Sequence, residues 1–394
     1  MTVKTPKNIC IFEDDQFFTL FPLTYLRPVF ELRCGAVTLA ERIRRFFPNS
    51  DILYQCRDYL APLLTENSAA IRVNQMINDD CLFINGSVLC DQALVNTVLQ
   101  NTDCTFTYNN KTIAFWNKLT TSKKEIDVRC IRYPWDLIKL NAEALKDDFE
   151  FTSKKIHGRL YDGVHLIQPE NISIGADSKI KPGAVLDAEH GPIIIGNGVT
   201  IMPNAVIEGP CYVGDHSIIK AGAKIYEGTS IGPTCKAGGE VEASIIHGYS
   251  NKQHDGFLGH SYIAEWCNLG ADTNTSDLKN NYSSVKVTIN GETYDSGLLF
   301  VGLIMGDHSK SGINTMFNTG TVVGISSNIF GGGFPSKYIP SFSWADGANT
   351  AEYRMDKAID VARTVMARRK VTFTPAYQTL LQYIFEMTSH ERTS

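Results

Sequence analysis

The stretch that decides the fold is residues 195–243, which divides into sixes as IGNGVT-IMPNAV-IEGPCY-VGDHSI-IKAGAK-IYEGTS-IGPTCK-AGGEVE-A. An aliphatic residue opens every group: Ile195, Ile201, Ile207, Val213, Ile219, Ile225, Ile231, Ala237 and Ala243. Four places after the first eight stand small or β-branched residues: Val199, Ala205, Cys211, Ser217, Ala223, Thr229, Cys235 and Val241. Glycine, proline and asparagine fall between these positions.

This period predicts a left-handed parallel β-helix built from six-residue repeats. A short strand supplies one inward aliphatic side chain, the chain turns a corner, and three such sides close one coil. Stacking the coils at strand spacing, about 4.8 Å, places equivalent side chains above one another in the core. Glycine, asparagine and proline suit the tight corners. An α-helix would need apolar residues every 3.6 positions, which a period of six does not provide.

The frame extends beyond this stretch and is interrupted. Upstream it continues through Ile174, Ile180 and Leu186, and then shifts by three at residues 189–192, which we expect to form a protruding loop. Downstream it is broken at residues 250–255 and about 274–296, and resumes at Leu298, Ile304, Met316 and Val322. Loops that interrupt a solenoid often carry function.

The flanks predict two further domains. Residues 1–155 indicate an α/β domain, with strands expected at 9–12, 52–54, 81–84 and 104–108 and helices at 36–46, 91–100 and 134–149. We expect the β-helix domain to span 156–345. Residues 346–394 should form a helical cap over the open strand edges, with helices at 351–370 and 375–388.

Composition excludes several classes of protein. The 37 Lys and Arg against 42 Asp and Glu give a net charge of -5, and the only basic tract is 368–370. We interpret this triplet as the solvated end of a helix, so nucleic acid is not an expected partner. No run of about 18 apolar residues predicts a membrane span. The ten scattered cysteines lack metal-ligand spacing and suggest reduced thiols in a cytoplasmic protein.

The repeat region resembles a known family. The motifs are residues 252–260 (KQHDGFLGH), 268–273 (NLGADT), 306–310 (GDHSK), 314–320 (NTMFNTG) and 334–344 (FPSKYIPSFSW). They resemble the Bacteroidetes-type bifunctional UDP-N-acetylglucosamine pyrophosphorylase and glucosamine-1-phosphate N-acetyltransferase. The resemblance implies acetyl-CoA as donor, a sugar phosphate as acceptor, and a homotrimer, or a dimer of trimers, with the site at a subunit interface.

The resemblance also implies roles for single residues. His254 falls on the catalytic base, Asn268 and Phe257 on sugar-contacting positions, and Ala271 on the acetyl-CoA site. Lys224 falls where the family has a phosphate-binding Arg.

Three positions depart from the family pattern. Phe257 replaces a Tyr. Glu242 replaces a Lys that binds the sugar phosphate, which reverses the charge. Asp277 replaces an Asn near the substrate amine.

The N-terminal part resembles sugar-phosphate nucleotidyltransferases through residues 21–29 (FPLTYLRPV). This implies UTP or dTTP as a substrate, with Arg27 and Arg33 on phosphate and Asp14 or Asp15 on Mg²⁺. The family's phosphate-binding loop is rich in glycine, whereas residues 13–18 (EDDQFF) contain none.

Acyl transfer from a thioester to an amine needs a base, and histidine has a suitable pKa range. From the residues alone, His254 is either this base or an ordinary surface histidine. His308 is a second candidate, either paired with Asp307 as a catalytic residue or bonded across the trimer in a structural role. His260 is expected to be structural.

Three functions remain open. The first is an acetyl-CoA-dependent N-acetyltransferase acting on a hexosamine 1-phosphate or related sugar. In this case the N-terminal domain either catalyses nucleotidyl transfer or is inactive. The second is a nucleotidyltransferase whose β-helix only trimerises. The third is a non-catalytic binding protein.

Overall fold

A computed structural model describes residues 5–67, 71–75, 80–347 and 349–392. The chain divides into two compact units. The first unit comprises residues 1–20, 26–32 and 37–133, and the second comprises residues 21–25, 33–36 and 134–394. Within the described residues, no helix has the length and apolar character needed to cross a membrane.

The first unit is an α/β domain around a seven-stranded sheet in the order β5-β4-β1-β6-β8-β7-β9. Strand β1 pairs in parallel with β4 on one side and β6 on the other. The strands of this sheet are β1 (Asn8–Phe12), β4 (Asp51–Gln55), β5 (Arg72–Val73), β6 (Cys81–Asn85), β7 (Thr105–Tyr108), β8 (Lys111–Trp116) and β9 (Lys123–Glu125), and β3 (Val37–Thr38) lies outside it. The helices are α1 (Leu39–Arg45), α2 (Ala61–Asn67) and α3 (Gln92–Gln100). Their apolar faces bury one cluster that includes Ile9, Ile43 and Leu94.

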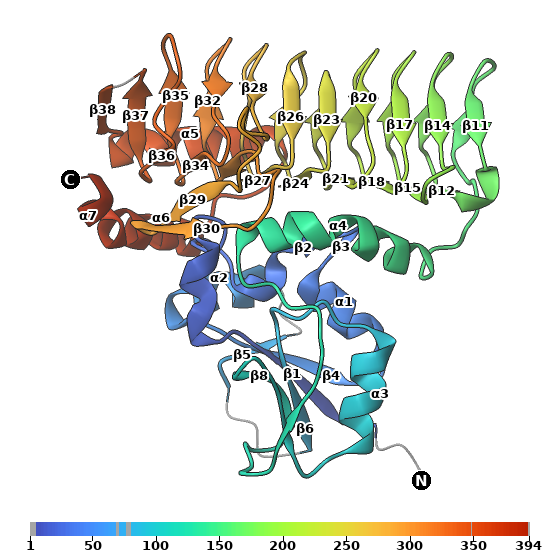
Figure 1. The fold of residues 1–394 in the computed structure, drawn as a ribbon, viewed down its shortest axis with the longest axis vertical. Helices are drawn as coiled ribbons and strands as arrows, with labels where there is room; N and C mark the ends of the chain where they lie inside the picture. Colours follow the sequence, from blue (N-terminus) through green and yellow to red (C-terminus); the bar gives the residue numbers. More distant parts are fainter. Residues whose placement is uncertain (1–4, 68–70, 76–79, 348, 393–394) are drawn as a thin grey trace. The chain divides into compact units, whose positions relative to one another are not determined.

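The second unit is a solenoid with three parallel faces, and Figure 1 shows its short strands stacked coil upon coil. The first face contains β10 (Arg159–Leu160), β13 (Lys179–Ile180), β16 (Thr200–Ile201), β19 (Ile218–Ile219), β22 (Lys236–Ala237) and β25 (Asn251–Lys252). The second contains β11 (His165–Ile167), β14 (Val185–Asp187), β17 (Val206–Glu208), β20 (Lys224–Ile225), β23 (Glu240–Glu242) and β26 (Phe257–Gly259). The third contains β12 (Ile172–Ile174), β15 (Ile193–Ile195), β18 (Cys211–Val213), β21 (Thr229–Ile231), β24 (Ile245–Gly248), β27 (Tyr262–Glu265), β31 (Ile304–Met305), β34 (Val322–Val323) and β36 (Tyr338–Ile339).

The later coils of the solenoid extend the first face and add a separate pair of strands. Bridges from Asn251 through Asn268 to Lys310 extend the first face to β32 (Lys310–Ser311), β35 (Asn328–Phe330), β37 (Ser343–Asp346) and β38 (Asn349–Glu352). Strands β28 (Asn274–Thr275) and β33 (Met316–Phe317) form a separate parallel pair, and β28 packs beside β26. The predicted fold class, an α/β domain followed by a left-handed parallel β-helix with C-terminal helices, is confirmed.

The six-residue period places side chains in the core as predicted. The aliphatic positions from Ile195 to Ala237 are at most 2 % exposed and belong to one hydrophobic cluster. Two positions are corrections. Ala243 is half-buried with a φ of 42°, because it forms the corner between β23 and β24. Met316 points outward at 38 % exposure, and the next residue, Phe317, fills the core instead.

The two predicted breaks differ from each other. Strand β25 (Asn251–Lys252) is paired in the first face, so residues 253–256 form an ordinary corner rather than a break. The unusual corner is one coil earlier, where only Gly238 and Gly239 join β22 to β23. The second predicted break is a true insertion, because Ile263 of β27 pairs with Met305 of β31 and the antiparallel hairpin of β29 (Lys286–Ile289) and β30 (Glu292–Asp295) lies between them in the chain.

The structure divides the chain differently from the predicted domains. Helix α4 (Pro134–Phe149) belongs to the second unit, whose long continuous segment begins at Pro134, whereas the predicted domain boundary is at residues 155–156. The reason is packing, since α4 contacts β18, β21 and β27 and runs beside these coils in Figure 1. Strand β2 (Arg33–Cys34) also belongs to this unit.

The C-terminal helices belong to the same unit as the solenoid. They are α5 (Met355–Arg368), α6 (Pro375–Met387) and α7 (Ser389–Arg392). Helix α5 starts later than predicted because residues 349–352 form β38, which pairs antiparallel with β37. The helices also pack along the coils, as Arg369 donates to Asn251 and Tyr377 bonds to His308.

Candidate functional site

His254 lies at the corner between the first and second faces. It is exposed, and none of the described side chains forms a hydrogen bond with its ring. The buried side chain of Lys252 holds this corner, because its Nζ donates to the carbonyl oxygens of Gly238 (3.1 Å) and His254 (2.8 Å). The short Gly238-Gly239 corner leaves room for this buried ammonium. The backbone that carries His254 is therefore fixed, whereas its imidazole is free to meet a ligand.

Burial lowers the pKa of Lys252 to about 8, and Asp255 and Asp272 partly oppose this shift. Below pH 8 the lysine is charged in both the folded and the unfolded chain, so the cost of burying the charge is fully present. Between pH 8 and the unfolded value of 10.5 the folded chain releases its proton first, and stability should rise with pH through this window.

We expect Lys252→Met to lower the free energy of unfolding by about 1–3 kcal/mol at pH 10, because two backbone carbonyl groups lose their donor. At pH 7 the loss should be smaller, because the variant is also relieved of the cost of burying a charge. The gap between wild type and variant should widen from pH 8 to 10. Denaturant unfolding at several pH values measures both effects, and a gap that is independent of pH would contradict the buried ammonium.

The second face carries the predicted acceptor residues in register. Lys224 of β20 pairs across strands with Glu240 of β23, which pairs with Phe257 of β26. The Lys224 Nζ lies 3.5 Å from the Glu240 Oε2. Glu242 occupies the adjacent outward position, opposite Gly259. Lys224 and Phe257 are thus brought together on one face, next to two carboxylates.

Asp277 is half-buried and pairs with His260. The His260 Nδ1 lies 2.8 Å from the Asp277 Oδ2, and the two side chains are 23 % and 13 % exposed. The His260 ring stacks on Phe300 with the centroids 4.9 Å apart. A carboxylate only accepts hydrogen bonds, so in this contact the His260 Nδ1 is the donor. The sequence suggested a structural His260, and this pairing was missed.

Asn268 lies on the first face rather than the second, bridged to Asn251 and Lys310. Ala271 lies at the corner one coil beyond His254, where Asp272 N donates to the carbonyl oxygen of Asp255. The structure thus places Ala271 next to the His254 corner, with Asn268 on one side of it and Phe257 on the other.

The first face next to this corner is basic. Lys220, Arg368 and Arg369 lie close enough to Lys236 to lower its pKa, after the larger effect of burial. Arg369 donates to Asn251 at 2.9 Å. None of these four cations forms an ion pair with a carboxylate within the described part of the chain. We call Lys220, Lys236, Arg368 and Arg369 the basic patch.

His308 is buried. Its Nε2 lies 2.8 Å from the Tyr377 hydroxyl of α6, and its ring stacks on Trp266 with the centroids 6.1 Å apart. Asp307 does not orient the imidazole through its Oδ1, which accepts from the backbone N–H of Glu265 at 3.0 Å. This arrangement supports the structural alternative for His308, within one chain rather than across a trimer.

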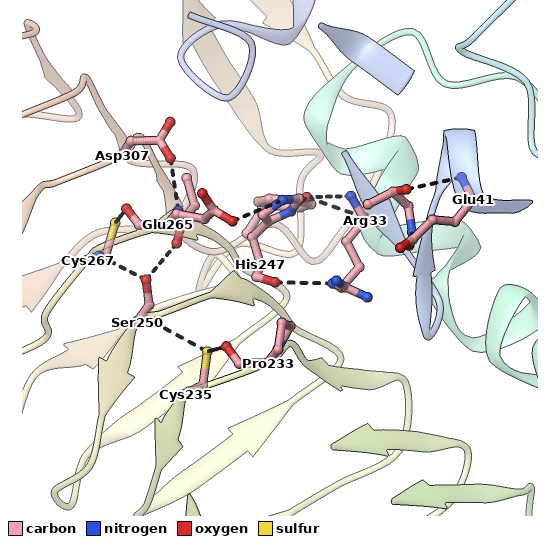
Figure 2. Close-up of polar contacts among 12 residues, drawn as sticks. Arg33, Glu41, Pro233, Cys235, His247, Ser250, Glu265, Cys267 and Asp307 are labelled. Atoms are coloured by element: carbon pink, nitrogen blue, oxygen red, sulfur yellow. Dashed lines mark hydrogen bonds and ion pairs between the residues drawn. The ribbon is translucent and has the colours of Figure 1, made fainter. Parts of the chain in front are cut away.

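Arg33, a predicted phosphate ligand, belongs to the second unit. Its Nε donates to the carbonyl oxygen of His247 at 3.1 Å, and its guanidinium lies over Tyr212. Figure 2 shows Arg33 beside His247, with Glu265 on the far side of that ring. The guanidinium is buried and bonded to backbone carbonyls, which is a structural position.

A cavity of about 750 Å³ lies in the first unit at the carboxyl ends of β1 and β4. Strand order reverses at β1, the place where open α/β sheets bind their ligands. Asp14 and Asp15 line it, together with Arg57 and Lys111. Arg27 does not; it is buried, and its carbonyl oxygen accepts from Arg57 at 3.0 Å.

The carboxylates of this cavity differ in their freedom to bind Mg²⁺. Asp14 accepts from Asn85 at 2.7 Å and forms an ion pair with Lys111 at 3.0 Å. Asp15 is exposed, and no described side chain pairs with it. Mg²⁺ takes most of its ligands from phosphate and water, so one carboxylate suffices. Asp15 fits such a role, whereas Asp14 is already neutralised.

Sequence reasoning missed Arg57 and Lys111. Arg57 is bonded to Glu13 at 2.8 Å and lies over the Phe17 ring. Nothing in the sequence shows that residues 57 and 111 lie at the same strand end as Asp14 and Asp15.

Comparison with known proteins matches both regions. A family model described as "Sugar nucleotidyl transferase" matches residues 9–156, and one described as "Bacterial transferase hexapeptide (six repeats)" matches residues 192–227. The chain combines a nucleotidyltransferase-like region with hexapeptide repeats.

The chain is also similar to curated bifunctional enzymes. It is 31% identical over 199 residues to the "Bifunctional sugar-1-phosphate nucleotidylyltransferase/acetyltransferase" of Sulfurisphaera tokodaii, covering 50% of this chain and 44% of that protein. It is 23% identical over 256 residues to the "Bifunctional protein GlmU" of Bartonella quintana, covering 61% and 52%. The chain thus spans about half the length of the curated relatives it matches.

Among solved structures, a UDP-N-acetylglucosamine acyltransferase from Campylobacter jejuni is 11% identical and covers 59% of this chain and 96% of its own, with a TM-score of 0.19.

Proposed function

We propose that the protein is an acetyl-CoA-dependent N-acetyltransferase acting on a hexosamine, its 1-phosphate or a related amino sugar, in the cytoplasmic synthesis of nucleotide sugars. The observation that carries this proposal is the exposed His254 on a rigid corner, between a face of predicted acceptor residues and the basic patch. Similarity to bifunctional sugar-1-phosphate nucleotidyltransferase/acetyltransferases supports it. The finer resemblance, to the Bacteroidetes-type enzyme, is part of the same proposal.

In the proposed reaction the amine nitrogen attacks the thioester carbonyl carbon of acetyl-CoA. His254 takes the proton that the amine loses, the C–N bond forms, and the C–S bond breaks. The proton then goes to the departing thiolate of CoA, so the products are the amide and the free thiol. Proton transfer of this kind contributes about 10²–10⁴-fold to a rate.

The donor carries several phosphate charges, and the basic patch offers cations without carboxylate partners beside His254. We therefore place the phosphates of CoA on this patch, with Ala271 next to the acetyl end. A homotrimer, or a dimer of trimers, would complete the site with a neighbouring solenoid.

We expect acetyl-CoA to raise the melting temperature of the wild type, because a ligand that binds the folded state stabilises it. Lys236→Glu should reduce this shift and raise the KM for acetyl-CoA at least about tenfold at low salt, since one charge on the patch is reversed. The control is Lys357→Glu, the same change on the exposed part of α5. Equal shifts in both variants would contradict this donor site.

The cavity of the first unit favours a second activity, nucleotidyl transfer to a sugar 1-phosphate, with UTP or dTTP as substrate. Asp15 would hold Mg²⁺, which neutralises phosphate charge. Pyrophosphate release that survives His254→Ala would support this activity and separate it from acetyl transfer.

A further inference from the structure

The second face around β23 and β26 carries excess negative charge. Glu240, Glu242 and Asp277 lie there with a single lysine, Lys224, whose Nζ is 3.5 Å from Glu240. Burial raises the pKa of Glu242. Among the neighbouring charges His260 lowers this pKa most, whereas Asp277, Glu227 and Glu240 each raise it. Carboxylates therefore outnumber cations around Glu242, at the position where the resemblance implies a Lys that binds the sugar phosphate.

The His260–Asp277 pair lies beside this carboxylate. A Cβ added to Gly259 would lie 2.2 Å from the Asp277 Oδ2 and 2.6 Å from the Phe257 Cζ, so both side chains lie over this glycine. Gly259 is also the cross-strand partner of Glu242. The His260–Asp277 pair, the Phe257 ring and Glu242 therefore lie together on the second face.

The backbone and neighbouring rings fix this arrangement. Val301 N donates to the Asp277 carbonyl oxygen at 2.9 Å, and Gly302 N donates to the His260 carbonyl oxygen at 2.8 Å. Phe300, directly before Val301 in the chain, stacks on one face of the His260 imidazole. Residues 300–302, at the end of the insertion that follows β28, therefore hold both His260 and Asp277 in place.

The two carboxylates at this place, Glu242 and Asp277, offer hydrogen-bond acceptors and no donors. A phosphate monoester also presents acceptors and about −1.5 to −2 charges. It would be repelled here, whereas the ammonium and hydroxyl groups of an amino sugar donate to all of these atoms.

We propose that the acceptor is an amino sugar that carries no phosphate on the ring bearing its amine, and that Glu242, Asp277 and His260 select it. This inference rests on the proposed acetyl transfer. It narrows the acceptor class from hexosamines and their phosphates to sugars with a neutral anomeric substituent. The three residues act as specificity determinants, with Asp277 holding His260 beside the bound sugar.

The test compares glucosamine with glucosamine 1-phosphate, each with acetyl-CoA, on the full chain. For the wild type, kcat/KM should be at least tenfold higher for glucosamine. Glu242→Lys should lower this ratio at least tenfold by restoring a cation, and Asp277→Asn should lower it by a smaller factor. His260→Gln should raise the KM for glucosamine more than it lowers kcat.

A ratio between two substrates is insensitive to partial loss of folded enzyme, so it separates specificity from stability. Glu170→Lys, the same charge change at an exposed position on an early coil, should leave the ratio unchanged. A wild type that prefers glucosamine 1-phosphate, or a ratio that Glu242→Lys does not move, overturns this inference and leaves acetyl transfer in place. A wild type that acetylates neither sugar overturns the proposed function itself.

Discussion

Replacing His254 by alanine should lower kcat for acetyl transfer by about 10²–10⁴-fold, with little change in the melting temperature. The ring is exposed and its corner is held through backbone atoms, by Lys252 Nζ on the His254 carbonyl oxygen. Truncation at Cβ thus removes the proposed base and leaves the corner intact. Release of the CoA thiol, followed with a thiol reagent under saturating acetyl-CoA, gives kcat directly.

The matched control for this experiment is His190→Ala. His190 is also an exposed histidine, on the loop at residues 189–192 of the same solenoid. We expect its activity to stay within about twofold of the wild type. If both variants retain full activity, His254 is not the base, whatever the enzyme acetylates.

The largest loss of stability should follow Asn141→Leu. Asn141 of α4 is fully buried and makes three hydrogen bonds. Its Oδ1 accepts from Gly35 N at 2.7 Å and from Ser230 Oγ at 3.1 Å, and its Nδ2 donates to the Gly228 carbonyl oxygen at 2.7 Å. Leucine is close in volume but leaves these three groups without a partner, at about 1–3 kcal/mol each.

We therefore expect Asn141→Leu to lower the free energy of unfolding by about 3 kcal/mol or more. Lys139→Leu brings the same side chain to the exposed side of the same helix and should stay within about 0.5 kcal/mol. Urea unfolding measured by circular dichroism compares the two. Similar midpoints would mean that α4 contributes little to the second unit.

The solenoid was predictable because its physics is local and repetitive. Each coil needs an inward aliphatic at one position and tight corners at fixed places, so Ile195 to Ala237 follow from spacing alone. The prediction went wrong where a corner changed length. The two-residue corner at Gly238 and Gly239 displaced the frame, and so the core position expected at Ala243 became a corner.

The candidate site was predictable only in part. His254 was found through its motif, and it is exposed at a corner of the solenoid. The His260–Asp277 contact joins residues 17 positions apart. Their pairing depends on a strand register that no local sequence pattern predicts. Arg27 and Arg33 are close in sequence yet belong to different compact units, which proximity along the chain could not reveal.

The second unit includes two segments from early in the chain, residues 21–25 and 33–36, together with the last helix, α7. The Tyr25 hydroxyl donates to the carboxylate of Glu391, 366 residues later. During synthesis on the ribosome, Tyr25 emerges long before its partner exists, so this bond forms only after Glu391 has also left the ribosome. A nascent chain stalled before α7 should expose residues 21–25 to proteases that cannot cut them in the finished protein.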